Sequence, residues 1–367
     1  MNEENKSKNV GLKVLVILLI VCILGAGGLL AFKIWKDQSV QEASQNDVEQ
    51  KAEEPPVAPV VTKKVEIYQG TDRPIAVMID NHKSAQPHAG LNEAYAVYEI
   101  IVEGGESRLM AIFKGKDLAK IGPIRSARHY FLDYALENDA IYVHYGWSPQ
   151  AERDISKLNV QNVNGLVYSS KDFWRVKDKK APHNAVTSTK NILTLAKDKK
   201  GYRTTSTEEA VLKYTVDEVK LENGVGADTI EIPYSKSNLV KYEYDAETQR
   251  YTRYSKGKLQ KDWDTDETVT TKNIIITFAK NTTLNDGENK DRQNLDNVKT
   301  LNGYYITNGK AIKITCEKTT RAGKTIYRNE AGEEIQVNDG NTFFQICPID
   351  ANVKITAKEV TEPEPAE

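Results

Sequence analysis

Cysteine is scarce in this sequence, and the spaced motifs of common metal and nucleophile sites are absent. Only three of the 367 residues are cysteine, and the chain contains no Cys-x-x-Cys, His-x-x-His or Gly-x-Ser-x-Gly arrangement. A dedicated metal site usually shows at least one close pair of ligands, and a serine nucleophile on a strand-to-helix elbow has its own signature. These absences argue against a metal centre and against serine-nucleophile chemistry.

An excess of positive charge is also lacking. The chain has 50 Lys and Arg residues against 52 Asp and Glu residues, a net charge of -2 and a pI near 6.3. Nucleic-acid binding depends on a basic surface that neutralises phosphates, and no basic stripe with interleaved aromatic residues is present. Nucleic acid is therefore disfavoured as a partner. The length allows two ordinary domains and terminal extensions.

Long apolar runs are confined to one segment near the start. Residues 14–32 carry no charge and are almost wholly apolar, and as a helix they would extend about 28 Å, enough to cross a bilayer. The slight excess of lysine on the preceding side, residues 1–13, predicts a cytoplasmic amino terminus and an outward-facing bulk. A cleaved signal peptide is the alternative. The residue before Cys22 is not small, which argues against a lipidation signal.

The rest of the chain divides by composition. Residues 33–65 are polar and then proline-rich, which predicts a disordered linker. Residues 66–215 alternate apolar strands with helical patterns and predict an α/β domain with a polar pocket, while 216–358 predict a mostly antiparallel β domain and 359–367 a disordered tail. The fold class is α+β. Strands of the second domain are predicted at 240–244, 251–254, 273–278, 304–307, 311–316, 325–327, 334–337 and 342–346.

A charged hairpin is predicted near the middle of the first domain. Apolar, β-branched runs at 96–102 and 108–113 flank a glycine pair at 104–105, a pattern typical of two strands joined by a turn. Side chains two residues apart share one face of a strand. We therefore expect the carboxylates of Glu99 and Glu103 to point the same way.

Two arginines follow at the predicted start of a helix. Pro123 suits the first helical position and apolar residues recur at helical spacing behind it, which predicts a helix over 124–136. Arg125 and Arg128 would share one face of its first turn, where the helix dipole favours an anion by roughly 0.3–1 kcal/mol per charge. We therefore expect a negative partner beside them, either a carboxylate or a bound anion. An internal ion-pair network that includes Arg108 is the alternative.

All five histidines lie in residues 66–215. Several fall in loops at strand ends, where acid/base or ligand-orienting roles become possible, and the pattern favours a polar pocket. The acid/base candidates are Glu99, Glu103, His144 and His183, and the ligand-binding candidates are His82, Arg108, Arg125, Arg128, Ser148, Arg175 and Asn184. A metal held by some of these histidines and glutamates is an alternative that no close ligand pair supports. We predict no metal and no cofactor.

Two of the three cysteines lie in predicted strands of the β-rich part. Ile312, Ile314 and Cys316 would share one strand face, so Cys316 is expected to be buried. Outside the cytoplasm, Cys316 and Cys347 can form a disulfide if their strands adjoin, and two buried free thiols are the alternative. Neither cysteine is expected to be catalytic.

Several of these runs are recognisable as a set. The chain contains, in order, RPIAVMIDNH, YEIIVEGGESRLMAIF, IGPIRSARHYF, YVHYGWSPQAE, FWR, PHNAVTST, YEYDAETQRYTRYSKG and GNTFFQICP. From about Arg73 to Ile349 it thereby resembles the YerB-like lipoproteins, a family defined by the amino- and carboxy-terminal halves of a domain of unknown function. The resemblance implies an envelope protein of Gram-positive-type bacteria and names no biochemical activity.

The family's polar motif positions coincide with the candidate residues. In this chain they are His82, Glu99, Glu103, Arg108, Arg125, Arg128, His144, Ser148, Arg175, His183 and Asn184. Family members commonly begin with a lipobox, which this chain lacks, so its membrane anchoring rests on the apolar segment. Cys316 and Phe344 stand where the family usually has tryptophan in its last strands, which strengthens the interpretation of the cysteines as a pair.

These observations predict a single-pass protein of the cell membrane with an extracytoplasmic bulk. Its first domain would bind an anionic or glycan-like ligand, such as a cell-wall glycan, in an Arg/His/Glu pocket. One alternative is an envelope hydrolase or transferase with Glu99 or Glu103 as acid/base and arginines that hold substrate charge. Another is a structural scaffold that meets a protein partner through the β-rich domain.

Overall fold

The computed structural model describes residues 64–358. The predicted cytoplasmic tail (1–13), transmembrane segment (14–32), most of the linker (33–65) and the terminal tail (359–367) lie outside the described residues. Among residues 64–358, no helix has the length and apolar character needed to span a bilayer.

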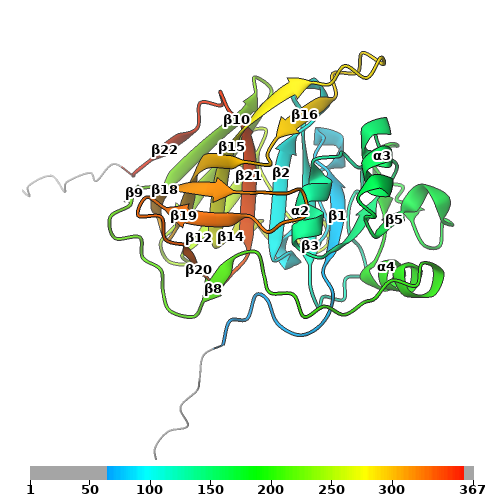
Figure 1. Ribbon diagram of the computed structural model, residues 1–367, viewed down its shortest axis with the longest axis horizontal. Coiled ribbons are helices and arrows are strands. Elements are labelled where there is room, and N and C mark those ends of the chain that lie inside the picture. The colour runs from blue at the N-terminus through cyan, green and yellow to red at the C-terminus, as the bar shows by residue number, and fades with distance from the viewer. Residues whose placement is uncertain (1–63, 359–367) are drawn as a thin grey trace, which may run out of the picture. The chain divides into compact units, whose positions relative to one another are not determined.

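A sheet of 12 strands passes through the molecule (Figure 1). Ten of its strands lie in the order β19 (Ile326–Asn329), β18 (Lys310–Glu317), β17 (Thr300–Thr307), β15 (Asn273–Thr283), β21 (Thr342–Pro348), β2 (Ala96–Ile101), β3 (Ser107–Phe113), β1 (Ile75–Asp80), β4 (Ile141–His144) and β5 (Asn162–Asn164). Off this path, β16 (Gln293–Asp296) pairs with β15, and β9 (Val225–Gly226) pairs with β18. Because β2 and β21 are parallel neighbours, strands from both halves of the chain share one hydrogen-bonded sheet.

A second sheet of six strands is antiparallel. It contains β13 (Lys258–Leu259), β12 (Arg250–Ser255), β11 (Asn238–Asp245), β10 (Thr229–Ser235) and β22 (Lys354–Thr356), with β14 (Thr270–Thr271) paired to β12. Exposure alternates residue by residue along β10, as expected of a strand with one buried face. Two short pairs complete the strands: β20 (Gln336–Asn338) with β8 (Lys213–Thr215), and β6 (Trp174–Arg175) with β7 (Ala185–Val186).

In residues 64–358, the helices are few and short. They are α2 (Phe131–Glu137), α3 (Pro149–Lys157) and α4 (Thr189–Thr194), and α4 continues as a π-helical turn over Leu195–Lys199. The Ser148 hydroxyl accepts a hydrogen bond from the Ala151 N–H at 3.2 Å and caps α3. Single 3₁₀ turns occupy Lys83–Ala85, Leu91–Glu93, Glu103–Gly105 and Gly165–Val167.

The main sheet is buried on both faces, so the molecule has three layers. In β1, Ala76 and Met78 pack into a core with α2 and α3, whereas Ile75, Val77 and Ile79 pack into a second core with the six-stranded sheet and α4. This two-sided burial explains why β1 is an unbroken apolar run. The described residues form one compact unit with its own cores, so a fragment that starts at Lys63 is expected to fold alone.

Local predictions with strong signals are confirmed. The chain is a mixed α and β structure made mostly of strands, the eight strands predicted after residue 216 are present, and β2 and β3 form the predicted hairpin.

The helix predicted over 124–136 is wrong in its first turns. α2 begins only at Phe131, and the residues before it form backbone hydrogen bonds with the end of β1. The Arg125 N–H donates to the Met78 carbonyl at 2.9 Å, and the Asp80 N–H donates to the Pro123 carbonyl at 2.8 Å. Because these bonds hold the segment extended, Arg125 and Arg128 do not lie on a helix.

Of the two alternatives for the cysteines, the structure contains the second, because Cys316 and Cys347 are both free buried thiols. Cys316 lies in β18 and Cys347 in β21, and β17 and β15 separate these strands. At about 4.8 Å per strand the separation is about 14 Å, twice the largest Cα distance of about 7 Å that a disulfide spans. The two side chains also belong to cores on opposite faces of the sheet. Burial raises the pKa of Cys316 to about 12.

A fully buried ion pair joins the two sheets. Arg253 of β12 and Glu99 of β2 form a salt bridge, and both side chains are 0% exposed. The other oxygen of Glu99 accepts hydrogen bonds from the Ser107 hydroxyl at 2.6 Å and from the Asn81 amide at 3.1 Å. The Arg253 Nε donates to the Tyr242 hydroxyl at 3.1 Å. Such a network is costly to disturb, because a buried charge without its partner cannot be hydrated.

Glu99→Gln tests this network. Glutamine can still bond to Asn81 and Ser107 but leaves the Arg253 charge uncompensated, so we expect the free energy of unfolding in urea to fall by roughly 3–5 kcal/mol. In the control, Glu93→Gln, the partner Lys116 is 46% exposed and the loss should stay below about 1 kcal/mol. Equal losses in both variants would contradict this account.

Candidate functional site

Two polar groups lie close together where β1 ends. Asp80 is the last residue of β1 and stands opposite Arg108 in the antiparallel register with β3. We call the set Asp80, His82, Arg125 and His183 the aspartate group, and the set Glu103, Arg108, Arg128 and Arg292 the glutamate group.

The aspartate group is assembled from three segments. One oxygen of Asp80, Oδ2, lies 2.7 Å from Nδ1 of His183 and 3.5 Å from Nε of Arg125. The other oxygen, Oδ1, accepts a hydrogen bond from the His82 N–H at 3.1 Å. The rings of His82 and His183 stack at a centroid distance of 4.3 Å and an angle of 14°. The end of β1, the segment before α2 and the loop after β6 therefore meet at one carboxylate.

The Asp80 carboxylate is ionised at neutral pH. Burial alone would raise the pKa of Asp80, but the Arg125 charge and the hydrogen bonds from His183 and the His82 N–H outweigh burial and hold this pKa below its usual range. The side chain of Arg125 is 26% exposed and that of His183 is 18% exposed, so both reach solvent.

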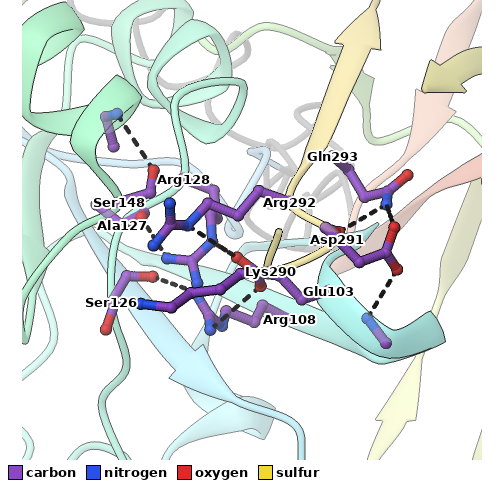
Figure 2. Close-up of polar contacts among 12 residues, drawn as sticks. Glu103, Arg108, Ser126, Ala127, Arg128, Ser148, Lys290, Asp291, Arg292 and Gln293 are labelled. Carbon is purple, nitrogen blue, oxygen red and sulfur yellow. Dashed lines mark hydrogen bonds and ion pairs between the residues drawn. The ribbon is translucent and has the colours of Figure 1, made fainter. Parts of the chain in front are cut away.

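The glutamate group gathers three guanidinium groups around one carboxylate (Figure 2). Glu103, in the turn after β2, lies 2.6 Å from Nε of Arg128, 3.7 Å from Nη2 of Arg108 and 3.9 Å from Nε of Arg292. Backbone carbonyls accept the remaining bonds: Arg108 donates to the Ser126 carbonyl and Arg128 to the Ala127 carbonyl, at 2.7 and 2.8 Å.

Positive charge exceeds negative charge across the two groups. Arg292 has its own partners in Asp286 and Glu288, so Arg108, Arg125 and Arg128 share only Glu103 and Asp80. Burial, together with the adjacent charge of Arg128, lowers the pKa of Arg108 to about 10. Guanidinium groups that lack a full set of carboxylates are suited to bind an anion.

Glu99 and Glu103 do not share a face, contrary to the prediction. β2 ends at Ile101 and a 3₁₀ turn begins at Glu103, so the alternation of side chains stops between the two glutamates. Glu99 lies inside the molecule with Arg253, whereas Glu103 is 20% exposed beside Arg128. Glu99 cannot reach a ligand in solution, and the predicted convergence of the two carboxylates is wrong.

Four further candidates have internal roles in the structure. His144 is fully buried with both ring nitrogens bonded, to the Gly146 carbonyl at 2.8 Å and the Asn162 side chain at 3.1 Å, and burial lowers its pKa to about 4. Ser148 caps α3. The Arg175 guanidinium donates to the Asn184 side chain at 2.7 Å, and Asn184 in turn closes the loop after β6.

Sequence reasoning missed two members of these groups. Asp80 ends an apolar strand and precedes a histidine by two residues, which is a usable signal for a polar site at a strand end. Arg292 precedes β16 and reaches Glu103 only because β15 and β16 extend beyond the sheet as a long pair. No local sequence pattern predicts the contact between Arg292 and Glu103.

Two cavities of the described residues lie away from these groups. One of 520 Å³ is bordered by the start of β1, the end of β3 and α4, and one of 320 Å³ lies between α2, α3 and the β15–β16 pair. No residue predicted to bind a ligand lines either cavity. The aspartate and glutamate groups therefore form a partly exposed polar surface outside these two cavities.

Fold and site together define an α+β protein whose two halves share a sheet and carry an arginine-rich polar surface at the end of β1. Residues 61–203 match the N-terminal domain, and residues 230–344 the C-terminal domain, of a protein family of unknown function, DUF3048. The chain belongs to this family.

The chain is similar to YerB of Bacillus subtilis in both sequence and structure. The chain is 32% identical over 291 residues, 79% of this chain and 86% of the relative, to "Putative lipoprotein YerB" of Bacillus subtilis (strain 168). It is also similar to the crystal structure of the YerB protein from Bacillus subtilis, with a TM-score of 0.69, 30% identity, and coverage of 77% of this chain and 94% of that one. The resemblance to YerB-like proteins is confirmed.

Acid should weaken the fold through Asp80 and Glu103. The pKa of Glu103 also lies below its usual range, because the Arg128 and Arg108 charges outweigh burial. A carboxyl group with a depressed pKa stabilises the fold above its unfolded-state pKa and loses this contribution as the pH falls through the folded-state value. The unfolding free energy should therefore drop as the pH falls below about 5, and less steeply in Asp80→Asn and Glu103→Gln. Slopes equal to wild type would contradict the assigned ion pairs.

Proposed function

We propose that this chain is a membrane-associated envelope protein whose folded part binds an anionic or glycan-like ligand at the aspartate and glutamate groups. The observation that carries the proposal is the count of charges: Arg108, Arg125 and Arg128 share two carboxylates. A bound anion would supply the missing negative charge, and a guanidinium fork matches carboxylate and phosphate oxygens in a bidentate manner.

In this proposal, Arg125 is the arginine most accessible to the ligand. Its shortest contacts, to Asp80 at 3.5 Å and to the Pro182 carbonyl at 3.4 Å, are both longer than a usual charge-assisted hydrogen bond. Its side chain is also the most exposed of the three arginines. A ligand can therefore gain contacts to Arg125 without breaking a strong internal ion pair.

An exposed tryptophan supports the glycan-like part of the proposal. Trp147 is 37% exposed and forms a backbone bridge with Ala127, which stands between Ser126 and Arg128 in the chain. Aromatic rings beside polar groups offer an apolar face to a sugar ring and leave its hydroxyls to polar partners.

The envelope location rests on two observations. A related protein bears the name lipoprotein, and residues 14–32 of this chain form an uncharged apolar run long enough to cross a bilayer. Because the residue before Cys22 is not small, we assign the anchor to the apolar run itself. The folded part would then lie outside the cytoplasm.

Arg125→Ala tests ligand binding. In the fragment 63–367, we expect the affinity for inorganic phosphate, measured by titration calorimetry at low ionic strength, to fall at least about tenfold, or 1.4 kcal/mol. The unfolding free energy should change by less than about 1 kcal/mol, because the ion pair of Arg125 is long and partly exposed. A parallel titration with a neutral N-acetylglucosamine oligomer reports on the glycan-like alternative.

Arg153→Ala is the matched control, because Arg153 is exposed on α3 and bonds only to Gln150 among the described residues. This variant should retain phosphate affinity. The proposal fails if the wild-type fragment shows no saturable binding of either probe, or if Arg125→Ala binds phosphate as well as Arg153→Ala does.

Protease accessibility tests the location. When the full chain is produced in a bacterium and the wall is removed, a protease added outside should degrade the folded part while a cytoplasmic marker protein survives. Protection of the folded part until the membrane is lysed would contradict the extracytoplasmic assignment.

A further inference from the structure

Within residues 64–358, His82, His129 and His183 each have one ring nitrogen with a protein partner, and only His82 and His183 of these belong to the aspartate group. His88 and His144 have both ring nitrogens within hydrogen-bonding distance of protein groups. In His82 and His183 only Nδ1 has a protein partner in residues 64–358. Their Nε2 atoms are therefore available to a group from solution. The two rings stack face to face with a centroid distance of 4.3 Å.

The protein contacts fix the tautomers of the two rings. His183 must donate its Nδ1 proton to the ionised Asp80 carboxylate at 2.7 Å, so the neutral ring presents a lone pair at Nε2. His82 accepts a hydrogen bond at Nδ1 from the Ser84 N–H at 3.1 Å, so its neutral ring carries the proton at Nε2. One ring thus offers an acceptor and its neighbour a donor.

A proton on His183 would change the net charge of the aspartate group. With both rings neutral, the Arg125 charge is offset by Asp80. When Nε2 of His183 takes up a proton, the imidazolium is stabilised by the same carboxylate, and the group gains a net positive charge. Arg125, the His82 Nε2–H and the His183 Nε2–H then form three donors, and a phosphate group has enough oxygens to accept from all three.

We propose that the aspartate group binds a terminal phosphate, as in a phosphomonoester, together with one proton that Nε2 of His183 accepts. This inference rests on the proposed function and specifies the ligand class. No covalent bond of the ligand changes, and the proton comes from solvent when the phosphate is already a dianion. A carboxylate ligand, which has two oxygens and one charge, should bind more weakly.

The surrounding charges favour His183 over His82 as the proton acceptor. Asp80 and Arg125 face His183, whereas the charges of Glu106 and Lys256, which pair with one another, act on His82 together with that of Asp80. Burial and the neighbouring His183 ring hold the pKa of His82 below its usual range, so His82 remains a neutral donor. His183 has the carboxylate partner that an imidazolium needs.

Calorimetry in buffers of different ionisation enthalpy tests the coupling. At a pH above the range in which imidazole ordinarily titrates, phosphate binding to the fragment 63–367 should be accompanied by net proton uptake. Above the range in which imidazole titrates, the affinity should fall by up to about tenfold per pH unit. His183→Gln should bind more weakly, without proton uptake and with a flat pH dependence. Lys180→Gln, which removes an exposed charge from the same loop, should behave as wild type.

The outcomes separate this inference from the proposed function. If phosphate binds in an Arg125-dependent manner without proton uptake, or if His183→Gln retains the uptake, the inference is overturned and the anion site stands. If acetate binds as tightly as phosphate, the assignment of the ligand class is overturned. If no anion binds, this inference is overturned, and the proposed function falls with it if the N-acetylglucosamine oligomer does not bind either.

Discussion

Glu99 and Arg253 face each other between the two sheets without contact with water, and the placement of the polar surface depends on this pair. The Asn81 amide is held by Glu99, and the residues on either side of Asn81 are Asp80 and His82. A buried salt bridge contributes little net stability, but it restricts the arrangements that a core can adopt. Here the restriction extends to the turn that carries the aspartate group, because that turn is fastened to the ion pair.

Carboxylates are distributed unevenly between the interior and the surface. The buried guanidinium of Arg253 has one carboxylate to itself, in Glu99, while near the surface Arg108, Arg125 and Arg128 depend on Glu103 and Asp80. The low dielectric of the interior enforces pairing there. At the surface, water and dissolved anions can screen an excess charge. Arginine can therefore stabilise the packing in the interior and remain available to anions at the surface.

The sequence predicts those structural features that depend on residues close together in the chain. The apolar run of β1 indicates a strand and the Ser148-Pro149 pair indicates the start of α3, each from a few adjacent residues. Arg125, His82 and His183 were also identifiable as site candidates. The extended segment that carries Arg125 was not predictable, because its hydrogen-bond partners come from β1 and β7, far away in sequence. The same holds for Arg292, since its position follows from strand pairing and a propensity scale contains no such information.

The position of β21 bears on when the chain can fold during its synthesis. This strand lies between β2 and β15 in the main sheet, although it follows both in the sequence. While the ribosome is still making the chain, β2 and β15 each lack a neighbour, and the sheet cannot close around them. The late central strand thus delays folding until most of the protein has been synthesised.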